Sequence, residues 1–187
     1  LSQKGLENNI NDNLWIKEYF LEYKKSKVLN SPSDKLKELL FHYNRNKESF
    51  YKWFYSFPHY KEIIGNQHVD KIIWVDGLGI EWLSLIIHTL ENEGYYVDKS
   101  FISRINLPSV TECNKLYTNN LVVIKDLDEY IHKKRNYEFP FDLINEINII
   151  VNIVKNHLIT NNKIMLLSDH GFTTFAISDF GNIKKYD

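Results

Sequence analysis

The sequence predicts an α/β fold: a mostly parallel sheet covered by helices on both faces and preceded by a small α-helical region. Two observations predict this division. From residue 69 onward, short apolar runs that are typical of buried strands alternate with segments of helical periodicity. Residues 1–68 carry helical periodicity alone. We therefore expect a helical region over 1–68 and an α/β domain over 69–187.

Three helices are predicted in the first region, because aromatic and aliphatic residues recur there at spacings of three and four. Ser31 is the expected cap of the second helix, with Pro32 in its first position. The shared aromatic face is either the core of a small bundle or a docking surface for a partner. The stripes are Ile16, Tyr19, Phe20 and Tyr23; Leu36, Leu39, Leu40 and Tyr43; and Phe50, Trp53, Phe54 and Phe57.

In the α/β domain, continuous apolar runs bounded by charge, glycine or turn residues predict strands. The predicted strands are 71–75, 95–97, 121–124 and 162–168. Longer amphipathic segments predict a helix over 80–90, ending near Gly94, and another over 143–158. This alternation is typical of a parallel sheet with helices packed on it.

Composition excludes several classes of protein. Lys and Arg number 23 against 24 Asp and Glu, for a net charge of −1, which disfavours a broadly basic nucleic-acid coat. The single cysteine, Cys113, excludes a disulfide framework and favours a reducing compartment, so we expect a cytoplasmic protein. No apolar run approaches the roughly 18 residues of a membrane span, and the first residues lack the pattern of a signal peptide.

Acidic side chains follow three predicted strands at their carboxyl ends, which is the edge where open parallel sheets bind ligands. Asp76 directly follows the first strand, Asp128 follows LVVI, and Asp169 with His170 follows IMLLS. Because clustered carboxylates repel one another unless a cation lies among them, this pattern predicts a cation site. Asp128 and His132 add to it, since residues four apart share a helix face and can bind one metal ion together.

A separate motif, Leu-Pro-Ser-Val-Thr-Glu at 107–112, predicts the start of a helix. Ser109 and Glu112 have the spacing of a capping box. Thr111 then falls in the first turn, beside unpaired N–H groups that favour an anion such as phosphate. The same place favours a threonine alkoxide when a metal ion binds its oxygen.

The sequence also raises three other interpretations: a dinucleotide-binding turn, the acid pair of a nuclease, and a basic surface that contacts phosphates. Asp76-Gly77-Leu78-Gly79 is not a dinucleotide-binding turn, because that motif needs a glycine where the chain has Trp82. Asp126-Leu127-Asp128, after a predicted strand, resembles the paired acids of Toprim-type nucleases and primases, which use magnesium, but this interpretation leaves Thr111 and the Asp169-His170 pair without roles. Basic residues could contact a phosphate backbone or form an ordinary solvated face. They are Arg104, Lys115 and the run Lys133-Lys134-Arg135.

Taken in order, four motifs resemble the alkaline phosphatase superfamily, and within it most closely the PglZ domain family of BREX phage-defence systems and some bacterial response regulators. The motifs are V-D-G at 75–77, L-P-S-V-T-E at 107–112, D-x-x-x-H at 128–132 and L-S-D-H-G-F at 167–172. The resemblance covers about residues 70 to 175 and implies an alkaline-phosphatase-like α/β domain.

The resemblance also implies a two-cation site with Thr111 as the nucleophile. The first ion would be held by Asp76, Thr111, Asp169 and His170, and the second by Asp128 and His132. The family pattern adds a further histidine to the second site, but this chain has none after His170. We expect either that this ligand lies beyond Asp187 or that the second site is incomplete. Zinc suits mixed Asp and His ligands best, with manganese or magnesium as alternatives.

The implied activity is that of a phosphatase or phosphodiesterase in bacterial antiviral defence, with a phosphate ester, nucleic acid included, as substrate. Two alternatives remain open. One is a non-catalytic scaffold that binds other phage-defence subunits, such as a DNA methyltransferase. The other is the magnesium-dependent nuclease that uses Asp126 and Asp128.

Overall fold

The computed structural model describes most of the chain as two compact units, which divide between Ser56 and Phe57. The helix over Tyr60–Gly65, which the sequence assigns to the N-terminal helical region, belongs to the second unit. Within the described residues, no helix has both the length and the apolar character needed to cross a membrane. The described residues are 14–29, 31–45, 47–100, 102–107, 111–133 and 137–168.

Three helices form the described part of the first unit, as the sequence predicts. The side chains of Ile16 and Leu36, one from each of the first two predicted stripes, are buried. The rings of Trp15 and Tyr43 stack with centroids 4.1 Å apart, so aromatic contacts join the first two helices. Phe57, predicted in the third stripe, lies in the second unit. The helices are α1 (Leu14–Leu29), α2 (Asp34–Arg45) and α3 (Lys47–Ser56).

The start of α2 differs from the prediction by two residues. Ser33, and not Ser31, is the capping residue: its hydroxyl oxygen accepts a hydrogen bond from the backbone N–H of Leu36 at 3.1 Å. The same hydroxyl donates to Glu22 of α1 at 2.9 Å. Serines stand on both sides of Pro32, and the hydroxyl of the second one, Ser33, joins the start of α2 to α1. Lys25 and Ser33 beside Glu22 lower the pKa of its carboxyl group.

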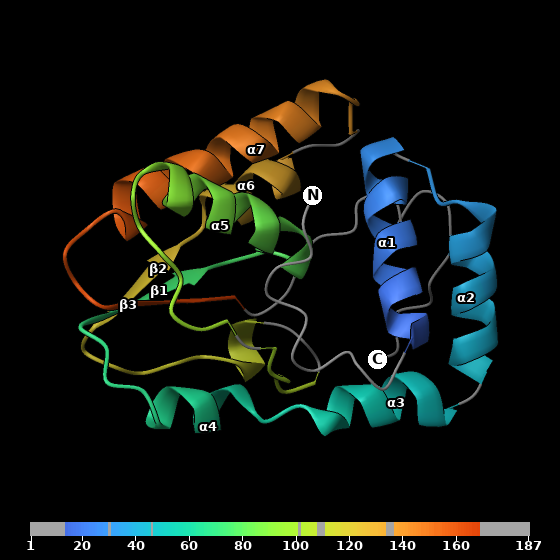
Figure 1. The fold of residues 1–187 in the computed structure, drawn as a ribbon, viewed down its shortest axis with the longest axis horizontal. Helices are drawn as coiled ribbons and strands as arrows, with labels where there is room; N and C mark the ends of the chain where they lie inside the picture. The colour runs from blue at the N-terminus through green and yellow to red at the C-terminus, as the bar shows by residue number, and fades with distance from the viewer. Residues whose placement is uncertain are drawn as a thin grey trace. The chain divides into compact units, whose positions relative to one another are not determined.

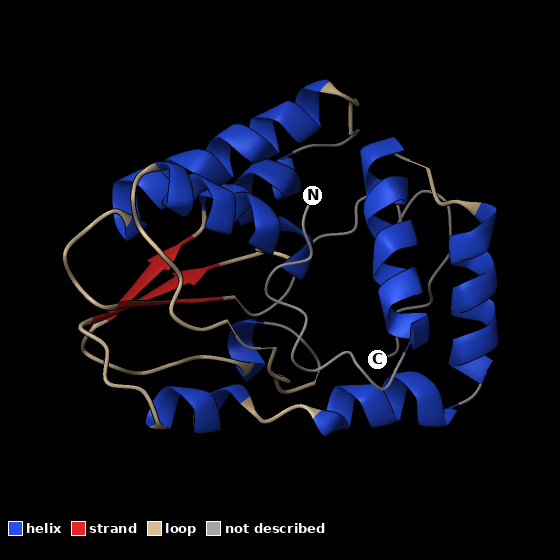
Figure 2. Ribbon diagram, viewed as in Figure 1, coloured by secondary structure: helices blue, strands red, loops and turns tan. Residues whose placement is uncertain are grey.

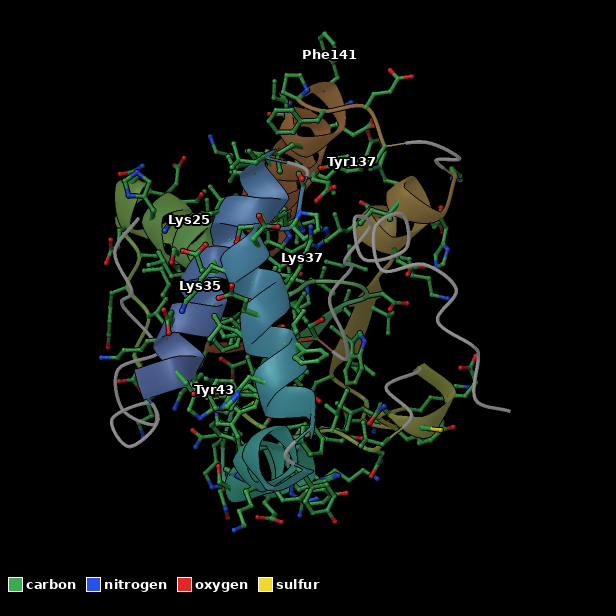
Figure 3. The ribbon with its side chains drawn as sticks, turned by 90° about the vertical axis from the view of Figure 1, so that its right-hand side faces the viewer. Lys25, Lys35, Lys37, Tyr43, Tyr137 and Phe141 are labelled. Carbon is green, nitrogen blue, oxygen red and sulfur yellow. The ribbon has the colours of Figure 1, made fainter. Side chains whose placement is uncertain are left out.

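Three lysines of α1 and α2 lie within ion-pair distance of acids. Figure 3 labels Lys25, Lys35 and Lys37 around these two helices. Lys35 lies 3.3 Å from Glu18 of the neighbouring helix, whereas the other two bind acids of their own helix. All three lysine side chains are at least half exposed, so each pair contributes little to stability.

A three-stranded parallel sheet lies at the centre of the second unit (Figure 2). Its strands are β1 (Lys71–Val75), β2 (Leu121–Ile124) and β3 (Ile164–Leu167), in the order β2-β1-β3. In the register, Val75 pairs with Ile124 and Trp74 with Leu167. The predicted α/β class and parallel sheet are therefore confirmed. Two strands match the predicted bounds, because each is an apolar run flanked by charged or turn residues.

The helices that follow the strands cover one face of this sheet (Figure 1). Ile73 and Val75 of β1 are fully buried there, against Leu127, Ile150 and Val154 among others. The elements are η1 (Ile80–Trp82), α5 (Leu83–Asn92), α6 (Asp126–Lys133), α7 (Phe141–Ile153) and the π-helical turn η3 (Val154–Leu158). The long helix predicted over 143–158 thus continues from α7 into η3.

The opposite face of the sheet contacts α4 (Tyr60–Gly65). Because side chains alternate along a strand, Trp74 points away from the face that Ile73 and Val75 occupy. The ring of Tyr60 meets Trp74 edge-on, with centroids 6.3 Å apart. Both aromatic side chains are buried. Helices therefore contact both faces of the sheet (Figure 1).

The strand predicted over 95–97 is wrong. The α5 helix ends at Asn92, and Gly94 adopts a φ of 81°, a left-handed conformation that suits glycine after a helix. The N–H of Tyr95 then donates to Leu90 O at 2.9 Å, and residues 95–97 have irregular structure. Tyr96 is exposed. This segment has strand-forming residues, but among the described residues it pairs with no strand.

Candidate functional site

The carboxyl edge of the sheet holds Asp76 at the end of its central strand. The backbone N–H of Asp76 donates to Ile124 O, the last residue of β2, at 2.9 Å. Asp76 is 5% exposed, which is unusual for a carboxylate. Gly77 follows with a φ of 74°, so the chain turns away from the strand at once. The central strand therefore fixes the backbone of Asp76 rigidly, next to the start of α6.

Asp128 and His132, the predicted ligands of the second ion, lie on α6, the helix that follows β2. Leu127 and Ile131 point into the core, and this orientation places Asp128 and His132, one residue further along, at the border of the buried face. His132 Nε2 and Asp128 Oδ1 are 3.4 Å apart. The Asp128 side chain is 20% exposed and that of His132 is 66% exposed. An acid oxygen and an imidazole nitrogen at this separation are close enough to bind the same cation.

Asp126, the partner of Asp128 in the nuclease hypothesis, does not share the face of α6 on which Asp128 and His132 lie. Both acids lie within α6 and are two residues apart, so they project from different faces of the helix. Asp126 is exposed. This arrangement does not bring the two carboxylates together on α6.

A buried polar cluster joins α6 to the beginning of α7. The hydroxyl of Tyr130, which lies between Asp128 and His132 in sequence, donates to Asp142. The backbone N–H of Glu138 donates to the other carboxylate oxygen of Asp142 at 2.6 Å. Burial, together with the nearby Glu146, raises the pKa of Tyr137. Asp142 is 1% exposed, so this cluster holds α6 in place and thereby supports its acid–histidine pair.

Phe141, at the first position of α7, is exposed at the end of the helix (Figure 3). It lies next to this cluster in sequence but takes no part in it. Polar side chains hold the α6–α7 junction, while the side chain of Phe141 is 68% exposed.

Thr111 lies at the start of a short helical turn, η2 (Thr111–Cys113). The prediction of a helical turn at this position is confirmed, although the turn is a 3₁₀ helix of three residues. Ser109, the predicted cap, lies outside the described residues, as does the Thr111 side chain. Glu112 is exposed.

Arg104, predicted as a phosphate contact, takes part in the packing of its own segment. Its Nε donates to Phe57 O at 3.1 Å, and its backbone N–H donates to Pro58 O at 3.0 Å. The backbone N–H of Tyr60 donates to Arg104 O at 3.0 Å. Arg104 therefore ties the segment before Thr111 to the start of α4. Lys115 is exposed, and so is Lys133, which binds Glu129 at 3.1 Å.

The remaining predicted ligands, Asp169 and His170, lie outside the described residues, which end at Ser168 after β3. Within the described part of the chain, no three His, Cys, Asp or Glu side chains come together as a metal-binding group. Asp76 and the Asp128–His132 pair thus offer the donor types of a zinc or manganese site, without a complete ligand set among described residues.

Sequence reasoning missed two residues of this region, Asn106 and Asn114. Asn114 is fully buried and bonds to the backbone of Asn106. No periodicity or motif marks these asparagines, because their importance comes from a contact across eight residues.

Comparison with known proteins gives no match: no family model matches the chain, and neither a curated protein nor a solved structure is similar to it at a significant level.

Proposed function

We propose that the protein is a metal-dependent phosphatase or phosphodiesterase of the alkaline phosphatase superfamily, similar to PglZ domains and acting in bacterial antiviral defence in the cytoplasm. One observation carries the proposal. Asp76 is buried at the end of the central strand, beside the start of the helix on which Asp128 and His132 lie 3.4 Å apart. Such acids at the carboxyl edge of a parallel sheet suit a cation-dependent reaction.

The residues present fit divalent cations in chemical type, since carboxylate and imidazole are preferred ligands of zinc. Asp76, Thr111, Asp169 and His170 would hold one ion, and Asp128 and His132 would hold a second. When bound, such ions polarise the phosphoryl group and neutralise its charge.

Thr111 would supply the attacking oxygen. A bond forms between its Oγ and phosphorus while the bond from phosphorus to the departing alcohol oxygen breaks, and the alcohol takes up a proton. Water then cleaves the bond from phosphorus to the Thr111 oxygen, which restores the hydroxyl and releases phosphate from a monoester substrate or a phosphate monoester from a diester substrate. Asp76, fixed at the strand end, orients this site, and the Leu127 and Ile131 side chains fix α6 and its acid–histidine pair.

Hydrolysis of model esters by the full chain tests this proposal. With zinc or manganese present, we expect release of nitrophenol from a nitrophenyl phosphate monoester or from the corresponding diester. Thr111→Ala is expected to lower the rate by about 10³-fold or more. Thr118→Ala, in an exposed turn before β2, is the matched control and should keep the wild-type rate.

Each alternative gives a different result. An unchanged rate in Thr111→Ala would show that the assigned nucleophile is wrong. Cleavage of DNA with magnesium that survives Thr111→Ala but not Asp126→Asn would favour the nuclease. Absence of hydrolysis, with a DNA methyltransferase subunit bound equally by wild type and by the Asp76→Asn/Asp128→Asn double variant, would favour the scaffold.

A further inference from the structure

Two asparagines join the ends of the segment that contains Thr111. Asn114 Oδ1 accepts a hydrogen bond from the backbone N–H of Asn106 at 2.8 Å, and Asn114 Nδ2 donates to the carbonyl of Asn106 at 3.3 Å. One side-chain amide therefore satisfies both backbone groups of the same residue. Asn114 is 0% exposed, so water does not replace these bonds if they are lost.

The Asn106 side chain extends this network in two directions. Its Nδ2 donates to the carbonyl of Cys113 at 2.8 Å, inside the same segment. Its Oδ1 lies 3.1 Å from Nε2 of His59. His59 Nδ1 accepts from the backbone N–H of Lys61 at 3.3 Å, so the proton of the neutral imidazole is on Nε2 and is donated to Asn106. The segment is thus tied to the N-terminus of α4.

A second connection leads from Asn114 to the central strand. The hydroxyl of Tyr60 donates to the carbonyl of Asn114 at 3.2 Å, and the Tyr60 ring packs on Trp74. Trp74 lies in β1, two residues before Asp76. A continuous series of buried contacts therefore joins the segment around Thr111 to the strand that ends at Asp76.

We propose that Asn106, Asn114 and His59 form an asparagine clamp that positions Thr111 for reaction. This inference rests on the proposed function, in which Thr111 is the nucleophile. The clamp residues act through the backbone on both sides of residues 107–113 and are positioning residues. An amide is required at 114, because an aspartate there would place a charged oxygen against the carbonyl of Asn106 in place of a donor.

Kinetics of Asn114→Asp in the full chain test the proposal. We expect kcat to fall by about 10²-fold, because a misplaced nucleophile loses its alignment, while KM changes by less than about twofold. Lowering the pH should recover part of the rate, since a protonated carboxyl group at position 114 can donate again. Asn119→Ala, in an exposed turn, is the matched control and should keep both constants. Loss of folded protein without a change in kcat per folded molecule would overturn the proposal.

A second measurement does not need activity. Cys113 is exposed and is the only cysteine of the chain, so a nitroxide label attached there reports on the clamped segment. The label should become more mobile in Asn114→Asp, and to a smaller extent in His59→Ala, which removes the bond from His59 to Asn106 but leaves the bonds between Asn106 and Asn114 in place. Unchanged mobility in both variants would overturn the clamp. Increased mobility in a chain whose wild type hydrolyses no ester would show that the asparagines hold the segment, but it would refute the proposed function and with it the role of the clamp in positioning Thr111 for reaction.

Discussion

Replacement of Asp76 by asparagine is expected to remove the stabilisation that zinc gives to the chain. Asp76 is 5% exposed at the end of β1, and asparagine keeps its shape while it removes the charge. A buried carboxylate has a free-energy cost that a bound cation offsets. Without metal, we therefore expect Asp76→Asn to be at least as stable toward unfolding as the wild type, because the substitution removes this cost.

With zinc, the wild type and Asp76→Asn should differ in stability. A ligand at 100 times its Kd stabilises the folded state by about 2.7 kcal/mol. For a chain of this length, that free energy corresponds to a rise in Tm of about 5–10 °C. The wild type should show this rise and Asp76→Asn should not.

Thermal unfolding with and without zinc, followed by circular dichroism, measures the difference. Asp98→Asn, which changes an exposed acid outside the site, is the control and should respond to zinc as the wild type does. An equal rise in Tm for Asp76→Asn would refute the role of Asp76 as a ligand. A loss of several kcal/mol without zinc would instead show that the carboxylate stabilises the turn after β1.

Three further predictions concern α6, α2 and alkaline stability. His132→Ala should lower the number of bound zinc ions by one in elemental analysis and change stability by less than about 0.5 kcal/mol, because its side chain is 66% exposed. Ser33→Ala should cost about 1–2 kcal/mol in urea unfolding, whereas Ser31→Ala should cost less than about 0.5 kcal/mol, and the reverse order would contradict the assigned cap. The raised pKa of Tyr137 means that the unfolded chain loses this proton first, so stability present below the ordinary pKa of 10.0 is lost as pH rises above it. The decline should be less steep in Tyr137→Phe, and an identical decline would contradict the burial of this phenol.

Much of the α/β unit could be predicted because its signals are local. The run KIIWV at 71–75 and the run LVVI at 121–124 are both strands with the predicted bounds. Apart from Lys71 at the start of the first run, both are apolar, and a central or partly covered parallel strand needs no other signal. The position of Asp76 at the carboxyl edge of the sheet could also be predicted, because it directly follows the first of these runs and parallel strands end at one edge.

The errors occur where structure depends on contacts between distant residues. Residues 95–97 have strand-forming side chains but pair with no strand in the described part of the chain. Ser31 has the local pattern of a cap, but Ser33 accepts the bond from Leu36 N–H and also bonds to Glu22 of α1. Asn106 and Asn114 could not be predicted, because an asparagine in an irregular segment has no distinguishing pattern. Their role depends on the fold that brings them together.

The most direct test of the central claim is anomalous diffraction from crystals of the full chain grown with zinc. The proposal predicts one anomalous peak beside the carboxylate of Asp76 and another between Asp128 and His132. Peaks only at other histidines, or none at the carboxyl edge of the sheet, would contradict a cation-dependent reaction at this site.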